Sequence, residues 1–281
     1  MVCGVTRDGK QPPGAAVEVF AGAVPADDPA WMGQRLARAE LAQAARFVHA
    51  ADRRAYLAAH ALLRVALDHV AGRRGKWVFE ADTYGKPRLR NSKPQLFFSM
   101  SHARGRVAVA VSRHGPVGVD VETDDRAHAL SGMDEAWLSA SERCALARMS
   151  GDGRGEQRLA WWVAKEALVK ALGLGLRQPL HELELPVFSA PDGVCRWPAD
   201  AGLTAAGAWM HALHLPPAFG PRTSAAWPLR VFRGAGFRLG LAVRWPSANG
   251  PVPGDVRTPA PAIALHELSL DSAVPVFIAS A

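Results

Sequence analysis

The sequence predicts an α+β fold, because two strongly periodic helices are interleaved with short strands of alternating pattern. Residues 52–70 and 158–172 carry apolar side chains at helical spacing. Residues 107–112 and 117–122 instead place valine at every second position, which is the period of a strand. A chain of 281 residues is long enough to bury one large core or two smaller ones.

The other elements of the first half follow the same two periods. Residues 15–24 are expected to form a strand and residues 35–47 a helix. The turn at residues 113–116 joins the two valine strands and favours a β-hairpin. A further helix should begin near Ser139, because Glu142 follows three residues later in the pattern of a capping box.

The second half ends in strands and a segment of biased composition. Residues 180–187 and 228–245 are expected to be strands, and the chain is rich in Pro, Gly and Ala after Pro246. We therefore expect an N-terminal half over 1–115 and a C-terminal half over 116–245. Residues 246–281 are expected to be a tail of uncertain order.

Positive charge is concentrated in one segment of the chain. The net charge is +7, but residues 46–106 contain 13 Lys or Arg against 4 Asp or Glu, a local surplus of +9. This clustering suggests an anionic partner, such as nucleic acid, a polyphosphate ligand or an acidic protein. The alternative is an arginine-rich composition that places arginine on every exposed helix face.

Cysteine usage and hydropathy exclude two classes of protein. Cys3, Cys144 and Cys195 are odd in number and far apart, so they indicate neither a disulfide framework nor zinc-ligand spacing. The first thirty residues lack an apolar run of signal-peptide length, and no stretch of eighteen apolar residues occurs. We expect a cytoplasmic protein without a membrane span.

Two acidic residues share one face of a predicted strand. Asp120 and Glu122 are two positions apart, which separates them by about 6.5–7 Å on that face. Two carboxylates held so close repel each other unless a cation lies between them. Mg²⁺ takes oxygen ligands and keeps several waters, so two or three carboxylates are enough to hold it. The alternative is that both residues decorate the solvent face of an exposed strand.

The helix over 158–172 carries a stripe of chemically distinctive residues. Trp162, Glu166 and Lys170 are spaced four apart and therefore lie on one side of the helix. Apolar packing of the tryptophan would present the two charged residues at the edge of a cleft. The alternative is an ordinary surface ion pair, which contributes about 0.2–0.5 kcal/mol to the stability of a helix.

Two further segments lie upstream, and the first of them could bind phosphate. Residues 99–105 (Ser-Met-Ser-His-Ala-Arg-Gly) combine hydroxyls, an imidazole and flexible backbone beside the basic segment. The alternative there is a solvated loop histidine. Residues 84–87 (Tyr-Gly-Lys-Pro) form a turn that presents a lysine.

In their order and spacing these motifs resemble the 4′-phosphopantetheinyl transferase superfamily, of the surfactin-synthetase-activating type. The family has a Gly-x-Asp-x-Glu strand followed by a Trp-x-x-Lys-Glu-x-x-x-Lys helix, which here are residues 118–122 and 162–170. The resemblance covers about residues 46–185. Its weaker motifs are Arg46-Phe47 followed by Asp52, Gly85-Lys86-Pro87, and Ser101-His102.

The resemblance implies a pseudo-dimer of two similar α/β halves, with the coenzyme A site in the cleft between them. It implies that Asp120, Glu122 and Glu166 bind Mg²⁺ in the C-terminal half, and that Glu166 and Lys170 are catalytic. The coenzyme A contacts that it implies are Arg46, Arg54, Lys86, Pro87, Ser101, His102, Asp120 and Lys170. Of these, Lys170 would contact the pyrophosphate. The adenosine and its 3′-phosphate would be held by Lys86, Pro87, Ser101 and His102.

The chain departs from the family pattern at two places, and one assigned residue has an alternative next to it. Arg53 fits the role of Arg54 after a shift of one residue. Ser99 stands where family members often have Asn, and Ala59-His60 stand where they often have Gly-Arg.

The implied activity transfers the 4′-phosphopantetheine arm of coenzyme A to a serine of an apo acyl or peptidyl carrier protein and releases 3′,5′-ADP, as a holo-acyl-carrier-protein synthase does. Carrier proteins of fatty-acid, polyketide, peptide-synthetase and siderophore pathways are all eligible. The base is expected to be Glu166, a bound water or Glu142.

The expected partners are coenzyme A and an acidic, serine-bearing carrier protein, with no nucleic acid, no membrane and a monomeric chain. One alternative is a non-catalytic coenzyme A or nucleotide-binding module of the same fold. A basic nucleic-acid-binding protein is disfavoured by two tyrosines in the whole chain and by the lack of a nucleic-acid-binding motif.

Overall fold

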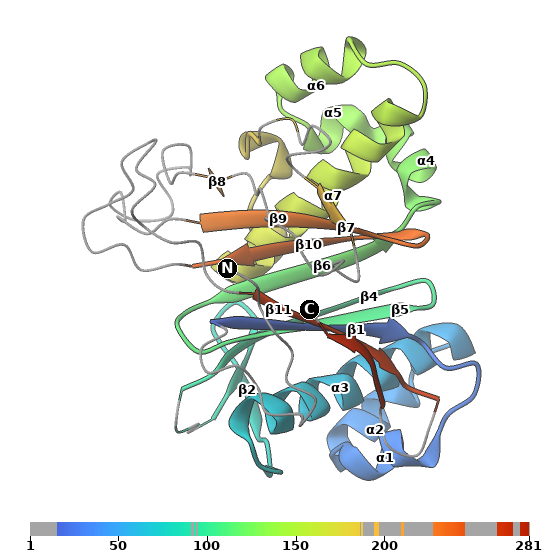
Figure 1. The fold of residues 1–281 in the computed structure, drawn as a ribbon, viewed down its shortest axis with the longest axis vertical. Coiled ribbons are helices and arrows are strands. Elements are labelled where there is room, and N and C mark those ends of the chain that lie inside the picture. The colour runs from blue at the N-terminus through green and yellow to red at the C-terminus, as the bar shows by residue number, and fades with distance from the viewer. Residues whose placement is uncertain are drawn as a thin grey trace.

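Two sheets lie between two long helices in the computed structural model (Figure 1). The helix α3 (Ala50–Ala71) packs on the first sheet and α7 (Asp152–Leu172) on the second, which confirms mixed α+β content. Among the helices described, none combines the length and apolar character needed to cross a membrane. The structure describes residues 16–90, 93, 95–185, 187, 194–196, 209–210, 227–244, 263–271 and 276–280.

The first sheet has the strand order β12–β11–β1–β5–β4. Its central strand β1 pairs in parallel with β11 and antiparallel with β5. Two short helices and a small separate hairpin, β2–β3, flank α3 in the sequence. The bounds are β1 (Val17–Ala23), α1 (Ala30–Arg35), α2 (Arg38–Ala44), β2 (Phe79–Ala81), β3 (Pro87–Leu89), β4 (Phe97–Ala103), β5 (Arg106–Ser112), β11 (Ile263–Ser269) and β12 (Val276–Ser280).

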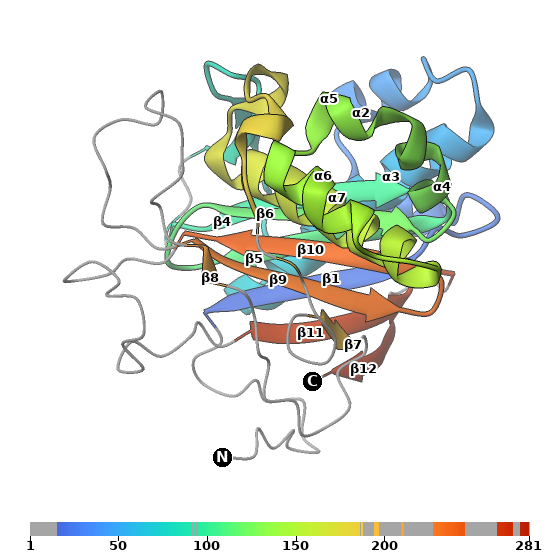
Figure 2. The same ribbon diagram turned by 90° about the horizontal axis from the view of Figure 1, so that it is seen from above.

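The second sheet has the order β6–β10–β9–β7, and β8 pairs with β9. Short helices join β6 to α7 and follow α7, and the view from above shows α7 crossing this sheet over β10 and β6 (Figure 2). The bounds are β6 (Val117–Thr123), α4 (Arg126–Leu130), η1 (Ser131–Met133), α5 (Asp134–Trp137), α6 (Ala140–Ala147), η2 (Gly175–Arg177), η3 (Leu180–Glu182), β7 (Val194–Arg196), β8 (Trp209–Met210), β9 (Trp227–Gly234) and β10 (Phe237–Val243).

Alternating residues of β5 lie in two different apolar cores, and β6 contributes to one of them. The valines of β5 pack beneath α3, whereas its alanines join an apolar cluster between the sheets. The valines of β6 enter the same cluster from the second sheet, so the opposite face of β6 is left to Gly118, Asp120 and Glu122. Burying each valine contributes about 1.5–3 kcal/mol, which fixes the face on which the two carboxylates lie.

The expected hairpin over residues 107–122 is wrong. The predicted strands form as β5 and β6, but β5 already pairs with β1 on one edge and β4 on the other. The chain therefore crosses at residues 113–116 to the second sheet, where β6 pairs with β10. Apolar contact across the two sheet faces replaces main-chain pairing between these strands.

The C-terminal residues also differ from expectation. Residues 263–269 and 276–280 of the expected tail form strands β11 and β12 of the first sheet. The strand expected over residues 180–187 is instead a 3₁₀ turn, η3, followed by extended chain whose Leu183 and Leu185 are buried beside α7. The expected strands over 228–245 are confirmed as β9 and β10, which pair as a hairpin.

The expected helix over residues 35–47 forms only in part, as α2, and the helix α1 before it ends at Arg35, where the extended and buried Leu36 follows. Glu40 fixes the position of α2. Its Oε2 accepts from the Ala37 N–H at 2.8 Å and from Arg64 Nη2 at 2.6 Å, while its Oε1 lies 2.8 Å from Nδ1 of His60. These contacts tie α2 to α3 through a largely buried carboxylate.

Replacing Glu40 with Gln should remove an acid-dependent part of the stability. Burial acts to raise the pKa of Glu40, but bonding to His60, the Ala37 N–H and Arg64 prevails and lowers it to about 2. The unfolded chain then binds more protons between about pH 4.5 and 2, so the native protein loses about 3 kcal/mol over that window and Glu40→Gln should not. Urea unfolding at stepped pH measures this. The control is Glu80→Gln, which changes an exposed glutamate. If the unfolding free energy of Glu40→Gln fell with decreasing pH as steeply as that of the parent, the assignment would be contradicted.

Candidate functional site

A buried aspartate on β6 forms the centre of the site. Asp120 is 6% exposed, and its Oδ1 accepts from Ser101 Oγ at 2.8 Å and from Lys170 Nζ at 2.6 Å. Lys170 Nζ also donates to Ser101 Oγ at 2.9 Å. The other carboxylate oxygen, Oδ2, is buried and has no hydrogen-bond partner among the described residues. Residues from β4, β6 and α7 therefore meet here, with one buried acceptor left over.

The segment that contains Ser101-His102 forms a strand and not the loop that we expected. Residues 97–103 form β4, the edge strand of the first sheet, and β4 lies beside β6 of the second. The Val119 N–H donates to Ser99 Oγ at 3.1 Å, so Ser99 joins the two strands where main-chain pairing is missing. Ser101, two residues on, then reaches Asp120.

Close packing of α7 on the sheet brings its charged stripe to Asp120. A Cβ atom at Gly118 would lie 1.9 Å from the Ala167 carbonyl oxygen, and one at Gly240 would lie 2.2 Å from the carbonyl oxygen of Val163. Gly240 is opposite Asp120 in the β6–β10 register. The two glycines thus let the helix backbone rest directly on the strands.

Replacing Gly118 with Ala should separate α7 from the sheet. A backbone contact of 1.9 Å cannot be relieved by rotating a side chain, so we expect a loss of about 3 kcal/mol or more of unfolding free energy. Denaturant unfolding measures this loss. The matched control is Gly153→Ala in α7 itself, where an added Cβ would meet nothing within 4 Å. Equal stability of the two variants would contradict the close approach.

Glu122 has a weakened acidity that reflects crowding of negative charge. Burial and the Asp120 carboxylate raise its pKa to about 7, against the opposing effects of Arg126, Trp162 and Lys170. Arg126 Nε lies 3.7 Å from the Glu122 carboxylate, and its guanidinium stacks 5.5 Å from the Trp162 ring centroid. Arg126 and Trp162 are partners that the sequence pattern did not assign to Glu122, although Arg126 lies at the i+4 position.

Glu166 experiences the same field from the helix side. Burial and Asp120 raise its pKa, and Lys170 acts in the opposite direction. In the described part of the chain, the ligand atoms of Asp120, Glu122 and Glu166 are not gathered within 4.8 Å of one another, and the Lys170 ammonium lies against Asp120 instead. One lysine thus faces three carboxylates, two of which have raised pKa values.

These features fit a divalent cation. The unpartnered Asp120 Oδ2 offers a buried ligand atom, and burial together with the Asp120 charge raises the pKa of both neighbouring carboxylates, Glu122 and Glu166. An all-oxygen donor set of this kind suits Mg²⁺.

A pocket of about 280 Å³ adjoins Lys170. The turn at residues 84–87, strand β4 and the end of α7 line it. Gly85 has φ of 85°, a left-handed conformation that glycine adopts without strain, and so allows the tight turn.

The Lys86 ammonium is committed to the end of α7. It is half-buried and donates to the carbonyl oxygens of Lys170 at 2.6 Å, Ala171 at 3.1 Å and Val117 at 3.3 Å. Burial lowers the pKa of Lys86 to about 8, against the charge of Asp82. Lys86 thus satisfies carbonyls at the C-terminus of α7 that the helix itself leaves open.

The other expected coenzyme A contacts lie on or near α3 and β4. His102 is exposed on β4, and partial desolvation together with Lys170 lowers its pKa, as does His60 of α3. Arg46 is exposed and donates to Gln43 Oε1 at 3.2 Å. The Arg53 guanidinium pairs with Asp28, so that Arg54 is the better candidate of the two. Pro87 begins β3 and borders the pocket.

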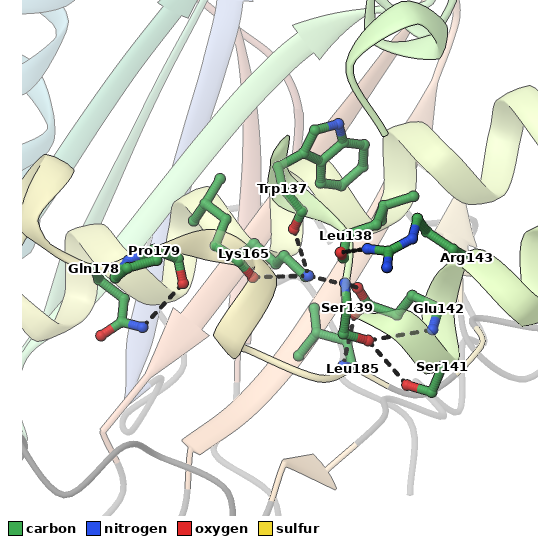
Figure 3. A network of polar contacts seen from close by, with 11 residues as sticks. Trp137, Leu138, Ser139, Ser141, Glu142, Arg143, Lys165, Gln178, Pro179 and Leu185 are labelled. Atoms are coloured by element: carbon green, nitrogen blue, oxygen red, sulfur yellow. Dashed lines mark hydrogen bonds and ion pairs between the residues drawn. The ribbon is translucent and has the colours of Figure 1, made fainter. Parts of the chain in front are cut away.

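Glu142 belongs to a structural network and not to the site (Figure 3). Its Oε2 accepts from Lys165 Nζ at 2.5 Å and from the Ser139 N–H at 2.8 Å, and its Oε1 accepts from the Leu185 N–H at 2.9 Å. Glu142 is 2% exposed, and the expected capping box with Ser139 is confirmed. A carboxylate enclosed in this way has no access to a substrate, so its alternative role as a base is not supported.

Comparison with known families supports the motifs. Residues 116–213 match the model of a family described as the 4′-phosphopantetheinyl transferase superfamily, which agrees with the expected superfamily and does not test the surfactin-synthetase-activating type. The matched range includes Asp120, Glu122, Glu166 and Lys170. No curated protein matches the chain.

Proposed function

We propose that this chain, in which a 4′-phosphopantetheinyl transferase segment supplies the central carboxylates, transfers phosphopantetheine from coenzyme A to a serine of an apo acyl or peptidyl carrier protein. The superfamily indicates phosphopantetheine transfer in general, and the acceptor, the product 3′,5′-ADP and the requirement for Mg²⁺ are our proposal. The observation that supports it most is the buried Asp120, which contacts Lys170 beside a pocket and is flanked by two carboxylates of raised pKa.

Asp120, Glu122 and Glu166 would hold Mg²⁺, which when bound neutralises charge on the diphosphate of coenzyme A. The buried Oδ2 of Asp120 supports this role because it has no other partner among the described residues. Lys170 now supplies the positive charge next to Asp120, at 2.6 Å. With Mg²⁺ bound at Asp120, the Lys170 ammonium would be available to bind the diphosphate of coenzyme A.

The pocket beside Lys170 would take part of coenzyme A, in a cleft between the two α/β halves. Each half has a sheet covered by one long helix, and β4 and β6 meet at the junction, which supports the pseudo-dimer. Pro87 lines the pocket, and Ser101 and exposed His102 lie on the strand beside it, where they would meet the adenosine and its 3′-phosphate. Lys86 would act indirectly, by holding the last turn of α7 that carries Lys170.

In the reaction, the serine oxygen of the carrier protein attacks the β-phosphorus and a new P–O bond forms. The bond from that phosphorus to the bridging oxygen breaks, and 3′,5′-ADP leaves with the electron pair. Glu166, which lies on the same helix stripe as Lys170, would take the serine proton. The Lys170 ammonium would stabilise negative charge that develops on the leaving diphosphate oxygen.

An acidic carrier protein would be attracted by the basic segment over residues 46–106. Several of its arginines and lysines are exposed on the surface, and they are Arg73, Arg74, Lys76, Arg88, Arg90 and Arg104. Opposite charge on the two surfaces would speed their encounter at low salt.

Intact-mass measurement of an apo carrier protein tests the proposal. Incubation with the chain, coenzyme A and Mg²⁺ should add one phosphopantetheine group, and a chelator should prevent the addition. A panel of apo carrier proteins from fatty-acid, polyketide and peptide-synthetase systems covers the eligible acceptors. Binding of coenzyme A without any mass gain across the panel would instead indicate a non-catalytic binding module.

A further inference from the structure

A second group of metal-ligand side chains lies in the first sheet, away from Asp120. Glu18 on β1, His69 in the last turn of α3 and His266 on β11 offer ligand atoms that all lie within 4.8 Å of one another. Glu18 Oε2 is 3.2 Å from Nε2 of His266 and 3.3 Å from Nε2 of His69. Glu18 and His266 are buried, and His69 is half-buried. One carboxylate oxygen thus faces two imidazoles.

The spacing matches the edge of a small tetrahedral metal site. Zn²⁺ binds imidazole nitrogen at about 2.0–2.1 Å and carboxylate oxygen at about 2.0–2.2 Å, so neighbouring ligands on a tetrahedron lie about 3.3 Å apart. Both measured separations from Glu18 Oε2 have this value to within 0.1 Å. Two histidines and one glutamate are also a recurrent zinc donor set that leaves a fourth position for water.

Aromatic packing holds the two imidazoles in place. The His266 ring stacks on Phe20 with centroids 4.6 Å apart, and the His69 ring meets Phe20 edge-on at 5.6 Å. Phe20 and His266 are also paired in the parallel β1–β11 register. Preorganised rings of this kind lower the ordering cost of metal binding.

Arg113 also lies beside the cluster. Its Nη2 lies 3.8 Å from Glu18 Oε1 and also donates to the carbonyl oxygen of Val70. Arg113 therefore lies next to Oε1 of Glu18, and Oε2 lies 3.3 Å from His69 Nε2 and 3.2 Å from His266 Nε2.

We propose that Glu18, His69 and His266 form a Zn²⁺ site that fastens β11 to β1 and α3. The nitrogen ligands favour Zn²⁺ over Mg²⁺, which separates this site chemically from the all-oxygen group at Asp120. His266 is 248 positions from Glu18, so the metal would link the two ends of the chain within the first sheet. The site lies on the first sheet and does not depend on the proposed transferase activity.

Metal analysis of the untagged full chain tests the site. The chain is stripped with a chelator, dialysed, given Zn²⁺ without coenzyme A, and measured for bound zinc and for thermal unfolding. About one tightly bound Zn²⁺ per chain is expected, together with a rise in the unfolding midpoint. Co²⁺ in place of Zn²⁺ should give the intense visible absorption of a four-coordinate centre.

The variants His69→Ala and His266→Ala should bind Zn²⁺ more than about 100-fold more weakly than the parent, because each removes a direct ligand. His69 lies at the half-buried end of α3, so His69→Ala gives a folded test if loss of His266 disturbs the sheet. The control is His128→Ala, an exposed histidine outside the cluster. No zinc binding by the parent chain, or equal binding by all three variants, overturns the proposal.

Discussion

Asp120→Asn should reduce phosphopantetheine transfer by at least about 10³-fold while the protein stays folded. Asparagine keeps the size of the side chain and an oxygen that can accept from Ser101 and Lys170, but it lacks the negative charge. It also replaces the unpartnered Oδ2 with an amide NH₂ group, which has no lone pair to offer a cation. The loss should appear in kcat/KM measured by mass gain of the carrier protein.

The control for Asp120→Asn separates a local effect from a general one. Glu135→Gln changes an exposed carboxylate of α5 by the same chemistry and should leave transfer unchanged. Asp120→Asn should also relieve repulsion on Glu122 and Glu166, whose raised pKa values depend in part on the Asp120 charge. Its unfolding free energy should therefore equal or exceed that of the parent. Normal turnover of Asp120→Asn with Mg²⁺ would exclude Asp120 from the chemistry.

Much of the site could be predicted from local pattern alone. Alternation along 117–122 places Asp120 and Glu122 on one face, and the structure keeps that face towards α7 because the valines fill the inter-sheet core. The spacing of Glu166 and Lys170 predicts a shared helix stripe, and Lys170 does reach Asp120. Both signals are local, because they follow from the geometry of a single strand or a single helix.

The errors concern which elements meet across the chain. Valine alternation in residues 107–122 cannot tell two paired strands from two strands in facing sheets, and here β5 has both of its edges occupied. A parallel partner for β1 lies at the far end of the sequence, so residues 263–269 lacked any local sign of their pairing. The glycine at 118 marked the motif, but its contact with the Ala167 carbonyl depends on packing that no local pattern contains.

The roles of the lysines were the hardest to predict from the sequence, because they depend on how deeply each lysine is buried. Lys86, Lys165 and Lys170 are all motif lysines in the sequence, yet only Lys170 contacts the central aspartate. Lys86 binds helix carbonyls, and Lys165 is 0% exposed beside Glu142. Two lysines of α7 thus have different roles, because Lys165 pairs with Glu142 and Lys170 with Asp120.

Lys165→Met should destabilise the protein by about 3–5 kcal/mol, because it leaves the Glu142 carboxylate buried without its cation. Lys165 Nζ donates to Glu142 at 2.5 Å and to the carbonyl oxygens of Trp137 at 3.0 Å and Leu180 at 2.9 Å. It therefore joins α7 to the segments on either side of it (Figure 3). Urea unfolding should show a lower midpoint with an unchanged slope.

The second variant in this experiment distinguishes a structural lysine from a functional one. Lys165→Met combined with Glu142→Gln removes the unpaired charge and should recover a large part of the lost stability, since both partners of the ion pair are then neutral. Lys170→Met, five residues along the same helix, should lose transfer with a smaller loss of stability than Lys165→Met, because the Lys170 side chain is 31% exposed and that of Lys165 is 0% exposed. If Lys165→Met instead unfolded like the parent and failed only in transfer, Lys165 would belong to the site and the network around Glu142 would not be structural.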